Sequence, residues 1–552
     1  MNRQQKTAFI GWWIRGNIEP EAGDSAVRAA ILNVTEPVCL VHIGDRLGAG
    51  HRGTVVLGDI SRQPAGAYPL VAYAPALPPG NLGDPGFRSD HGLRFAYVMG
   101  AMANGITSVR MVEEAARSGM IAFFGAAGLP LEQVESAIDH LQSRCAGLPF
   151  GFNLIHTPYD PDCELETVKL FLRRGIRLVS ASAYLDLTLP LIYYRLKGIH
   201  RNPNGEIVCP NRIVAKVSRT EVARKFLSPP PIKLLSQLVE KGWLTPREAD
   251  LAAWIPIAED LDAEADSGGH TDNRPALALL PTMLALRDEV VRLYPDPPLL
   301  RIGLGGGIAT PGSTAAAFVM GAAYVLTGSI NQACIESGTS DTVRQMLAEA
   351  TQADVAMAPA ADMFEMGVKV QVLKRGTLFP FRAAKLYELY NTYDRYEKIP
   401  ESQRAVLERD FFKDSFQGEW ERTRSFFSVR DPRQIARAED DPKHKMALVF
   451  RAYLGKSSGW ANTGDPSRRI DYQIWCGPAM GSFNQWVKGS FLEKMENRKV
   501  VTVAMNLLLG AAVLTRTRWL IAQGAVLPAG AEKFDPMPDE EIERLLSPSS
   551  DS

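Results

Sequence analysis

The residues with the clearest potential for chemistry are a run of glycines between a predicted strand and a predicted helix. Leu300–Ile308 reads LRIGLGGGI, and Thr310-Pro311 follows it. Thr310 suits a helix N-cap and Pro311 suits the first helical position. Backbone N–H groups without side chains can approach a phosphate, and the helix dipole favours an anion there. The pattern lacks the third glycine of a dinucleotide fingerprint and the Gly-Lys-Ser/Thr of a P-loop, so it indicates a different phosphate site.

A second glycine loop follows about twenty residues later. Tyr324–Ile330 reads YVLTGSI, a predicted strand that ends in Gly328-Ser329. Each loop alone is also consistent with a simple tight turn. Two such loops after the last two strands match the place where α/β barrels hold a phosphate, so the pair favours phosphate binding.

One of the eight histidines stands in a distinctive context. Glu264–Asn273 reads EADSGGHTDN at the end of a predicted strand, so Gly268 and Gly269 precede His270. The glycines would let the imidazole approach a ligand without obstruction, and an imidazole can donate or accept a proton near neutral pH. A lone loop histidine is often structural. The neighbouring phosphate loops make His270 an equally good candidate for catalysis.

Other strand ends would share the same rim. Met99, Gly100 and Ala101 follow the first strand, Asn153 ends the third, and Lys216 ends the fifth. Small residues allow a flat ring to rest on the backbone, and the lysine could meet a phosphate or an anionic ring. These features favour FMN over NAD. Pyridoxal phosphate would need a lysine that forms a Schiff base, and Lys216 alone is weak evidence for this cofactor.

A metal centre is not predicted. Asp260, Asp262, Glu264 and Asp266 alternate along one strand, and we expect at most two of these carboxylates to point the same way. The six cysteines have no C-x-x-C pair, which fits buried, reduced thiols and a cytoplasmic location.

The elements that would position these residues alternate between short apolar runs and amphipathic helices. Eight strand candidates can be counted: Arg94–Met99, Met120–Phe124, Phe150–Leu154, Leu178–Ser182, Arg212–Val217, Ala258–Glu264, Leu300–Leu304 and Tyr324–Thr327. Eight βα units close a barrel, so the predicted fold class is α/β, a TIM (β/α)8 barrel that binds FMN. An open doubly wound sheet is the competing topology.

The chain has room for more than a barrel. Its 552 residues are 46% hydrophobic and 22% charged, with 61 Lys and Arg against 62 Asp and Glu, which excludes a disordered or uniformly basic protein. We expect a strand-rich N-terminal segment at 1–85, with strands at Val38–Ile43 and Thr54–Ile60, the barrel at 86–375, and a mostly helical region at 376–552.

The helical region contains two features with alternative interpretations. Its aromatic residues between 386 and 420 are interleaved with charges, which suggests either single-stranded nucleic acid binding or helices with a buried aromatic face; the equal density of acidic residues favours the helices. Val500–Leu514 is apolar but is interrupted by Thr502 and Asn506. It falls short of the roughly 20 residues of a membrane span, so we expect a buried core helix.

At these motifs the chain resembles a known group of enzymes. DSGGH at Asp266–His270, GLGGGI at Gly303–Ile308, LTGS at Leu326–Ser329 and an upstream MGAMANG are similar to the FMN barrels of nitronate monooxygenases and FMN-type enoyl-ACP reductases, with Asp266 where those enzymes carry Glu. The longer stretches EADSGGHTDNRP, APAADMFEMGVKVQVLKRGTLFP, DPKHKMALVFRAYLG and DYQIWCGPAMGSFNQWVKGSF resemble the PfaD-type trans-acting enoyl reductases of polyketide and polyunsaturated fatty-acid synthases, over about residues 5–525.

The resemblance implies reduction of an α,β-unsaturated thioester on an acyl carrier protein, with FMN as cofactor and NADPH as reductant. His270 matches the active-site histidine, as proton donor or substrate-orienting group. The cofactor-binding positions implied are Met99, Gly100, Ala101, Asn153, Lys216, Gly268, Gly269, Gly305, Gly306, Gly307, Gly328 and Ser329.

Two other functions compete with this one. A nitronate monooxygenase would use the same FMN barrel with oxygen as acceptor, and a non-catalytic scaffold of a synthase complex would have lost its cofactor. No nucleic-acid or membrane partner is expected. The sequence leaves open whether NADH replaces NADPH and whether two copies form a homodimer.

Overall fold

The computed structural model describes residues 9–58, 61–158 and 160–547 of the chain. The chain forms two compact units. The first comprises Met1–Tyr97, Ala309–Val325 and Val487–Ser552, and the second comprises Val98–Ile308 and Leu326–Trp486.

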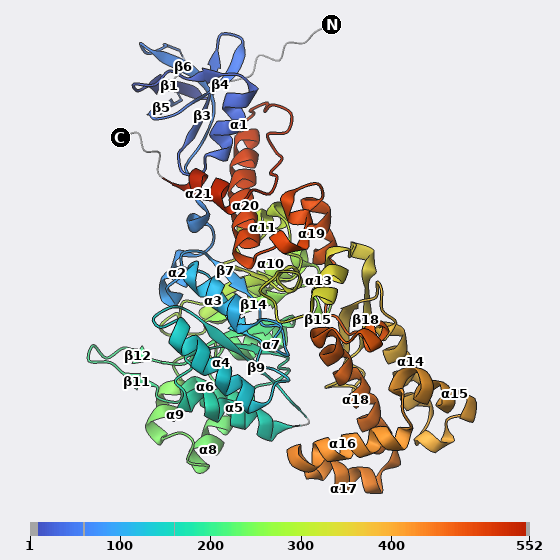
Figure 1. The fold of residues 1–552 in the computed structure, drawn as a ribbon. Helices are drawn as coiled ribbons and strands as arrows, with labels where there is room; N and C mark the ends of the chain where they lie inside the picture. The colour runs from blue at the N-terminus through green and yellow to red at the C-terminus, as the bar shows by residue number, and fades with distance from the viewer. Residues whose placement is uncertain (1–8, 59–60, 159, 548–552) are drawn as a thin grey trace. The chain divides into compact units, whose positions relative to one another are not determined.

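The first unit contains an antiparallel sheet with strand order β2-β4-β3-β6-β1-β5 (Figure 1). Trp13, Cys39, Val41 and Leu70 form a buried cluster on this sheet. The predicted strand-rich segment is confirmed, although residues 59–60 of one predicted strand lie outside the described residues. The elements are β1 (Gly11–Arg15), β2 (Glu21–Ala22), α1 (Asp24–Leu32), β3 (Val38–Ile43), β4 (Arg46–Gly50), β5 (Gly53–Leu57), β6 (Ala67–Ala74) and α2 (Pro85–His91).

The long apolar helix α20 (Val500–Ala522) belongs to the same unit. Its 23 residues are long and apolar enough to cross a membrane, so the expectation that it is too short was wrong. However, 78% of its most apolar window is buried inside the protein, against α11 (Pro311–Val319), α1 and β6. Its Arg516 donates to the carbonyls of Asn33 and Glu36 at 2.7 and 2.8 Å, as suits a core helix.

The second unit is built on a closed barrel with strand order β10-β13-β14-β16-β17-β7-β8-β9. Six of its neighbouring pairs have a parallel register: β10·β13, β10·β9, β13·β14, β14·β16, β7·β8 and β8·β9. Most of the strand residues are apolar because helices cover the outer face of the barrel. The predicted barrel is confirmed in place of the open sheet. Its strands are β7 (Tyr97–Met99), β8 (Ile121–Phe124), β9 (Gly151–Ile155), β10 (Leu178–Ser182), β13 (Arg212–Val217), β14 (Asp260–Glu264), β16 (Arg301–Gly305) and β17 (Val325–Thr327).

Helices follow each of these strands along the chain. Several begin at a side-chain cap, as where the Ser108 hydroxyl accepts a hydrogen bond from the Met111 N–H at 3.1 Å. Those of the second unit are α3 (Val109–Arg117), α4 (Leu131–Arg144), α5 (Pro161–Arg173), α6 (Leu189–Leu196), α7 (Thr220–Leu227), α8 (Ile232–Glu240), α9 (Pro246–Ala252), α10 (Ala276–Val291), α12 (Ser329–Gln332) and α13 (Asp341–Ala348).

A small sheet that the sequence did not predict lies beside the barrel. Its strand order is β15-β19-β18, and its strands are β15 (Gly269–His270), β18 (Val355–Pro359) and β19 (Lys369–Leu373). His270 is the register partner of Val370. The catalytic candidate is therefore held by a sheet and not only by a loop.

A helical insertion, residues 379–471, leaves this sheet and returns to it. Leu373 donates its N–H to the Ile474 carbonyl at 2.8 Å, and Val372 pairs with Trp475, so the two ends of the insertion meet. The predicted aromatic residues pack inward, among them Phe411, Phe412, Phe416 and Trp420, which confirms the helical interpretation. The insertion contains α14 (Phe379–Thr392), α15 (Glu401–Val406), α16 (Phe416–Arg430), α17 (Pro432–Asp440) and α18 (Pro442–Thr463).

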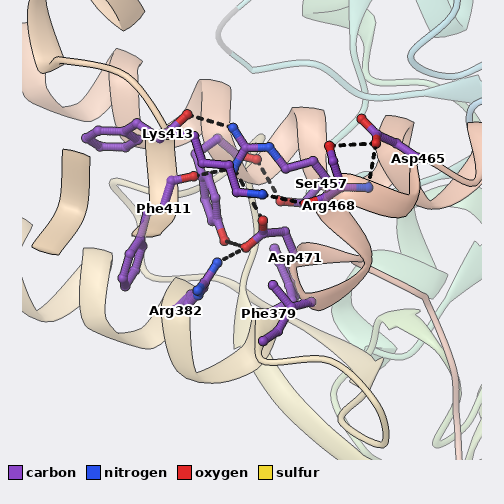
Figure 2. Close-up of polar contacts among 12 residues, drawn as sticks. Phe379, Arg382, Phe411, Lys413, Ser457, Asp465, Arg468 and Asp471 are labelled. Carbon is purple, nitrogen blue, oxygen red and sulfur yellow. Dashed lines mark hydrogen bonds and ion pairs between the residues drawn. The ribbon is translucent and has the colours of Figure 1, made fainter. Parts of the chain in front are cut away.

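A buried ion cluster joins these helices (Figure 2). Asp471 accepts hydrogen bonds from Arg382, from the Tyr453 hydroxyl at 2.7 Å and from Arg468 at 3.3 Å. Arg468 also donates to the carbonyls of Phe411 and Phe412, at 2.6 Å each. Each charge in this cluster has partners within the insertion.

Candidate functional site

A glycine-lined cleft, called here the glycine cleft, lies at the carboxyl ends of the barrel strands. It encloses about 630 Å³, including the space open to solvent. Strand ends from β7, β13, β14, β16 and β17 contribute to it, which is where barrel chemistry is expected. Its lining includes Gly100, Ala101, Lys216, Glu264, Ser267, Gly268, Gly306, Gly307, Gly328, Ser329, Gln332 and Trp475.

Several of these glycines leave space that a side chain would fill. A Cβ at Gly307 or at Gly328 would meet no other atom within 4 Å, so the backbone there faces open space. Gly306 has φ +86°, and its Cβ would lie 2.7 Å from the backbone of Ala265. The loop after β16 therefore requires glycine for its conformation and leaves a bare backbone on the cleft, as a phosphate site needs.

The wall opposite the barrel is supplied by a segment after the helical insertion. A Cβ on Gly268 would lie 2.9 Å from the Cys476 nitrogen, so the two backbones are in direct contact. The Gly477 N–H donates to the Ser329 hydroxyl at 3.0 Å. These contacts fix the Ser267–Gly269 loop and Ser329 beside Trp475.

Two charged side chains of the cleft lining meet on the inner face of the barrel. The Lys216 ammonium lies 2.6 Å from a Glu264 carboxylate oxygen. Burial lowers the pKa of Lys216, but the attraction of Glu264 and its hydrogen bond outweigh burial, so the pKa is raised. The ammonium is therefore held charged against its partner.

Asp262 lies below this pair and is fully buried. Neither of its carboxylate oxygens has a hydrogen-bond partner among the described residues. Burial raises its pKa to about 7, although Lys216 acts in the opposite direction. A buried, unsatisfied carboxyl group with a perturbed pKa is typical of functional sites.

The expectation that at most two of the alternating carboxylates share a face was wrong. Asp260 accepts a hydrogen bond from Arg301. A Cβ on Gly305 would lie 2.6 Å from an Asp262 oxygen, and Asp262 is also the register partner of Lys216. Glu264 forms an ion pair with Lys216. Side chains two residues apart on a strand point the same way, so all three face the barrel interior. The described residues nevertheless contain no group of three or more His, Cys, Asp or Glu placed to hold a metal ion.

His270 lines a second cleft, called here the side cleft, which encloses about 700 Å³ including open space. Both clefts are lined by Lys216 and Glu264, so they adjoin. His270 Nε2 lies 3.2 Å from Asp362 Oδ1. Burial lowers the pKa of His270, but Asp362 raises it by charge and hydrogen bond, and the net shift is upward. The raised pKa favours the protonated form of the imidazole.

The structure brings most of the predicted site residues together. Eight line the glycine cleft: Gly100, Ala101, Lys216, Gly268, Gly306, Gly307, Gly328 and Ser329. Gly269, with φ +82°, makes the turn to His270. Met99 is buried in β7, Asn153 donates to Ser182 Oγ at 2.9 Å, and Gly305 faces Asp262; these three line neither cleft.

Sequence reasoning missed several residues of the site. Trp475 and Asp362 come from segments far along the chain, and no local pattern marks them as neighbours of His270 or of the glycine loops. Glu264 stands out in the sequence only as one of several strand carboxylates. The stretch that contains Trp475 and Gly477-Pro478 carries the family resemblance, but nothing in it predicts contact with the glycine loops.

The six cysteines are all described, and none forms a disulfide. Four are buried as expected, whereas Cys163 and Cys209 are half-buried. None lines either cleft.

Comparison with known proteins identifies relatives over most of the chain. The crystal structure of the enoyl reductase domain of MlnA, from the macrolactin biosynthesis cluster of Bacillus amyloliquefaciens, is 40% identical with a TM-score of 0.76, and the match covers 80% of this chain and 99% of that one. Residues 393–472 match the family described as acyl-carrier-protein S-malonyltransferase, inserted helical domain. That match falls on the helical insertion.

Two curated relatives are similar at the sequence level. The polyketide biosynthesis protein PksE of Bacillus subtilis is 44% identical over 84% of this chain, and a polyunsaturated fatty acid synthase component of a Thraustochytrium species is 45% identical over 79%. This chain spans 63% and 30% of their lengths. The barrel, its helical insertion and the identity to the MlnA domain agree with the motif resemblance: the chain belongs to the PfaD-type enoyl reductases of polyketide and polyunsaturated fatty-acid synthases.

Proposed function

We propose that this protein is an FMN-dependent enoyl reductase that acts in trans on α,β-unsaturated acyl thioesters carried by an acyl carrier protein, with NADPH as reductant. The observation that carries the proposal is the junction of the two clefts at Lys216 and Glu264. One cleft offers bare backbone for a phosphate and a flat ring, and the other offers a proton-bearing histidine.

The residues of the glycine cleft fit FMN. Gly306, Gly307, Gly328 and Ser329 would hold the phosphate, because all four line the cleft and the backbone at Gly307 and Gly328 faces open space. Gly100 and Ala101 would border the ring, with the Lys216 ammonium as a cation near it. Bound FMN would supply the hydride that adds to the β-carbon of the enoyl thioester.

His270 would act on the other reacting atom. Saturation of the double bond also requires a proton at the α-carbon, and a protonated imidazole at the side cleft can donate one or orient the thioester carbonyl. Asp362 supports this role because it favours the charged form of His270.

The helical insertion would dock the carrier protein and shape the acyl channel. Support comes from the match of residues 393–472 to a domain of an enzyme whose name specifies an acyl-carrier-protein substrate. Because Leu373 and Ile474 are hydrogen-bonded, a short linker could replace residues 379–471. That variant should still bind FMN yet lose turnover of a carrier-bound substrate; retained turnover would overturn the docking role.

The reaction is tested by incubating the FMN-loaded protein with NADPH and an enoyl thioester on a carrier protein, and identifying the product by mass. We expect a saturated thioester and one NADPH oxidised per product. If the protein instead consumed oxygen with a nitronate and oxidised no NADPH when given the enoyl substrate, it would be a nitronate monooxygenase. If the protein retained no flavin absorbance after incubation with FMN and removal of the unbound flavin, it would be a non-catalytic scaffold.

The role of His270 is tested by His270→Ala. Loss of a general acid typically reduces the rate by about 10²- to 10⁴-fold, so kcat should fall by that order while FMN binding is retained. The measurement is steady-state reduction of the carrier-bound substrate alongside an FMN titration. Unchanged kcat would exclude His270 as an essential acid.

A further inference from the structure

Asp262 is the buried charge that the proposed reaction does not use. It lies in the middle of β14 with its side chain inside the barrel, fully shielded from solvent. A Cβ on Gly305 would lie 2.6 Å from one of its oxygens, so the absence of a side chain at Gly305 creates the space that the carboxyl group occupies. The barrel therefore accommodates this acid directly beneath the glycine cleft.

The groups that face Asp262 come from three strands. From β13, its register partner is Lys216. From β14 itself, Glu264 lies on the cleft side, and Asp260 on the other side is paired with Arg301 of β16 at 2.6 Å. The remaining inward positions of β16 are Gly303 and Gly305, which carry no side chain. Lys216 is thus the one cation among the described groups that can balance Asp262, and it is already held by Glu264.

If Asp262, Glu264 and Lys216 are all charged, the two carboxylates and one ammonium leave a net negative charge at the base of the cleft. With Asp262 protonated the trio is neutral, and with Asp262 ionised it carries one negative charge. An anion that binds in the glycine cleft meets this charge through a poorly hydrated interior, where charges interact strongly. Binding of the anion and ionisation of Asp262 must then oppose each other.

We propose that Asp262 is a positioning residue for the glycine cleft: its carboxylate, when ionised, draws on the Lys216 ammonium and adds a negative charge beneath an anionic ligand, so that binding of the ligand and protonation of Asp262 are coupled. The ligand considered is FMN, so the inference rests on the proposed function. When FMN binds at a pH where Asp262 is ionised, one proton passes from water to the Asp262 carboxylate. By linkage, the coupling acts equally in both directions.

The direction of the pH dependence follows from the raised pKa. Burial places the pKa of Asp262 at about 7, so the carboxyl is neutral below this pH and ionised above it. FMN binding should weaken as the pH rises through this region. Replacing Asp262 by Asn keeps the neutral form at every pH and removes the effect.

The test compares FMN affinity of the wild-type protein and the Asp262→Asn variant by quenching of flavin fluorescence, below pH about 6 and above pH about 8. We expect equal affinities at the lower pH and about tenfold tighter binding by the variant at the higher pH. Asp139→Asn, which removes an exposed carboxylate of α4, should behave as wild type at both. Equal affinities of wild type and Asp262→Asn at the higher pH would overturn the coupling.

Proton uptake provides a second measurement that needs no variant. Calorimetry of FMN binding above pH about 8, in two buffers of different ionisation enthalpy, should show protons taken up by the wild-type protein. Binding without proton uptake overturns the coupling and leaves the proposed function intact. Failure of the wild-type protein to bind FMN at all overturns both.

Discussion

Two buried ion clusters in the second unit differ in how completely their charges are satisfied. In the helical insertion, Asp471 has three hydrogen-bond donors and Arg468 reaches two backbone carbonyls as well (Figure 2). Below the glycine cleft, Lys216 pairs with Glu264, whereas Asp262 has no hydrogen-bond partner among the described residues. Both clusters are largely buried, and the second contributes Lys216 and Glu264 to the lining of the glycine cleft.

The difference separates a structural cluster from a functional one. A buried charge that is fully paired fixes one arrangement of its helices, and it has no capacity left for a ligand. A buried carboxyl group without a partner is costly in free energy, and it is retained where its charge state can respond to something that binds. We therefore expect substitutions in the insertion to alter stability and those in the barrel to alter binding and pH dependence.

The largest expected effect is on the insertion. Asp471→Ala would leave Arg382 and Arg468 without their carboxylate in a buried environment, which typically costs about 3–5 kcal/mol in the free energy of unfolding. Chemical denaturation followed by circular dichroism measures it. Asp410→Ala removes a half-buried carboxylate of the same insertion that forms an ion pair with the exposed Arg409, and it is the control. If the two variants were equally stable, the cluster in Figure 2 would not be a structural one.

A smaller effect of opposite sign is expected for Asp262→Asn. The folded protein holds the pKa of Asp262 at about 7, whereas an unfolded Asp titrates near 4, so the folded state binds the proton more tightly between these values. Stability contributed by this group should fall as the pH rises from about 4 to 7 and stay low above it.

The variant lacks this penalty, so Asp262→Asn should be more stable than wild type at pH about 8 and nearly equal to it at pH about 4. Urea denaturation at the two pH values measures the difference. A variant that is less stable at the higher pH would mean that the ionised carboxylate is well satisfied, and the comparison between the clusters would break down.

The ion pair of His270 and Asp362 at the side cleft should influence how the reaction rate depends on pH. Asp362→Asn removes the charge that raises the pKa of His270 and leaves the burial that lowers it, so His270 should lose its proton at lower pH. The falling limb of the pH–rate profile, or the imidazole resonance in an NMR titration, should move in the acidic direction. Asp354→Asn, a carboxylate next to the same small sheet, should leave the limb in place.

The smallest effect is expected at an exposed contact between the insertion and the barrel. Arg433 and Asp162 lie 3.0 Å apart with both side chains largely exposed, and such pairs contribute little because water and salt screen them. Asp162→Asn should leave the denaturation midpoint and kcat unchanged within precision, and it spares the bond from Arg433 to the buried Asp431. A clear loss of carrier-dependent turnover, with small-thioester turnover retained, would instead assign this surface to substrate docking.

Much of the barrel could be predicted because buried parallel strands are short apolar runs between turn residues, as in Leu178–Ser182 and Arg212–Val217, whose bounds agree with the structure. The small sheet could not. Its strand β15 has two residues. Lys369–Leu373 pairs on one side with the nearby Val355–Pro359 and on the other with the distant Gly269–His270, so no local period reveals the whole sheet.

The candidate site, like the fold, has one part that the sequence predicts and another part that it does not. Glycine loops and His270 are local patterns at strand ends, and the structure brings most of them into two adjoining clefts. Trp475 reaches the glycine cleft, and Asp362 reaches His270, only through tertiary packing. The expectation that at most two strand carboxylates share a face was wrong because side chains two residues apart on a strand point the same way, which places Asp262 inside the barrel with Glu264.

The most direct test of the proposed activity is a single turnover without oxygen. The FMN-loaded protein is reduced with NADPH, freed of excess reductant, and mixed rapidly with an enoyl thioester on a carrier protein while the visible flavin absorbance is followed. The account predicts return of the oxidised spectrum with one saturated thioester per flavin, and slower return in His270→Ala. A spectrum that stays reduced until oxygen is admitted would contradict it.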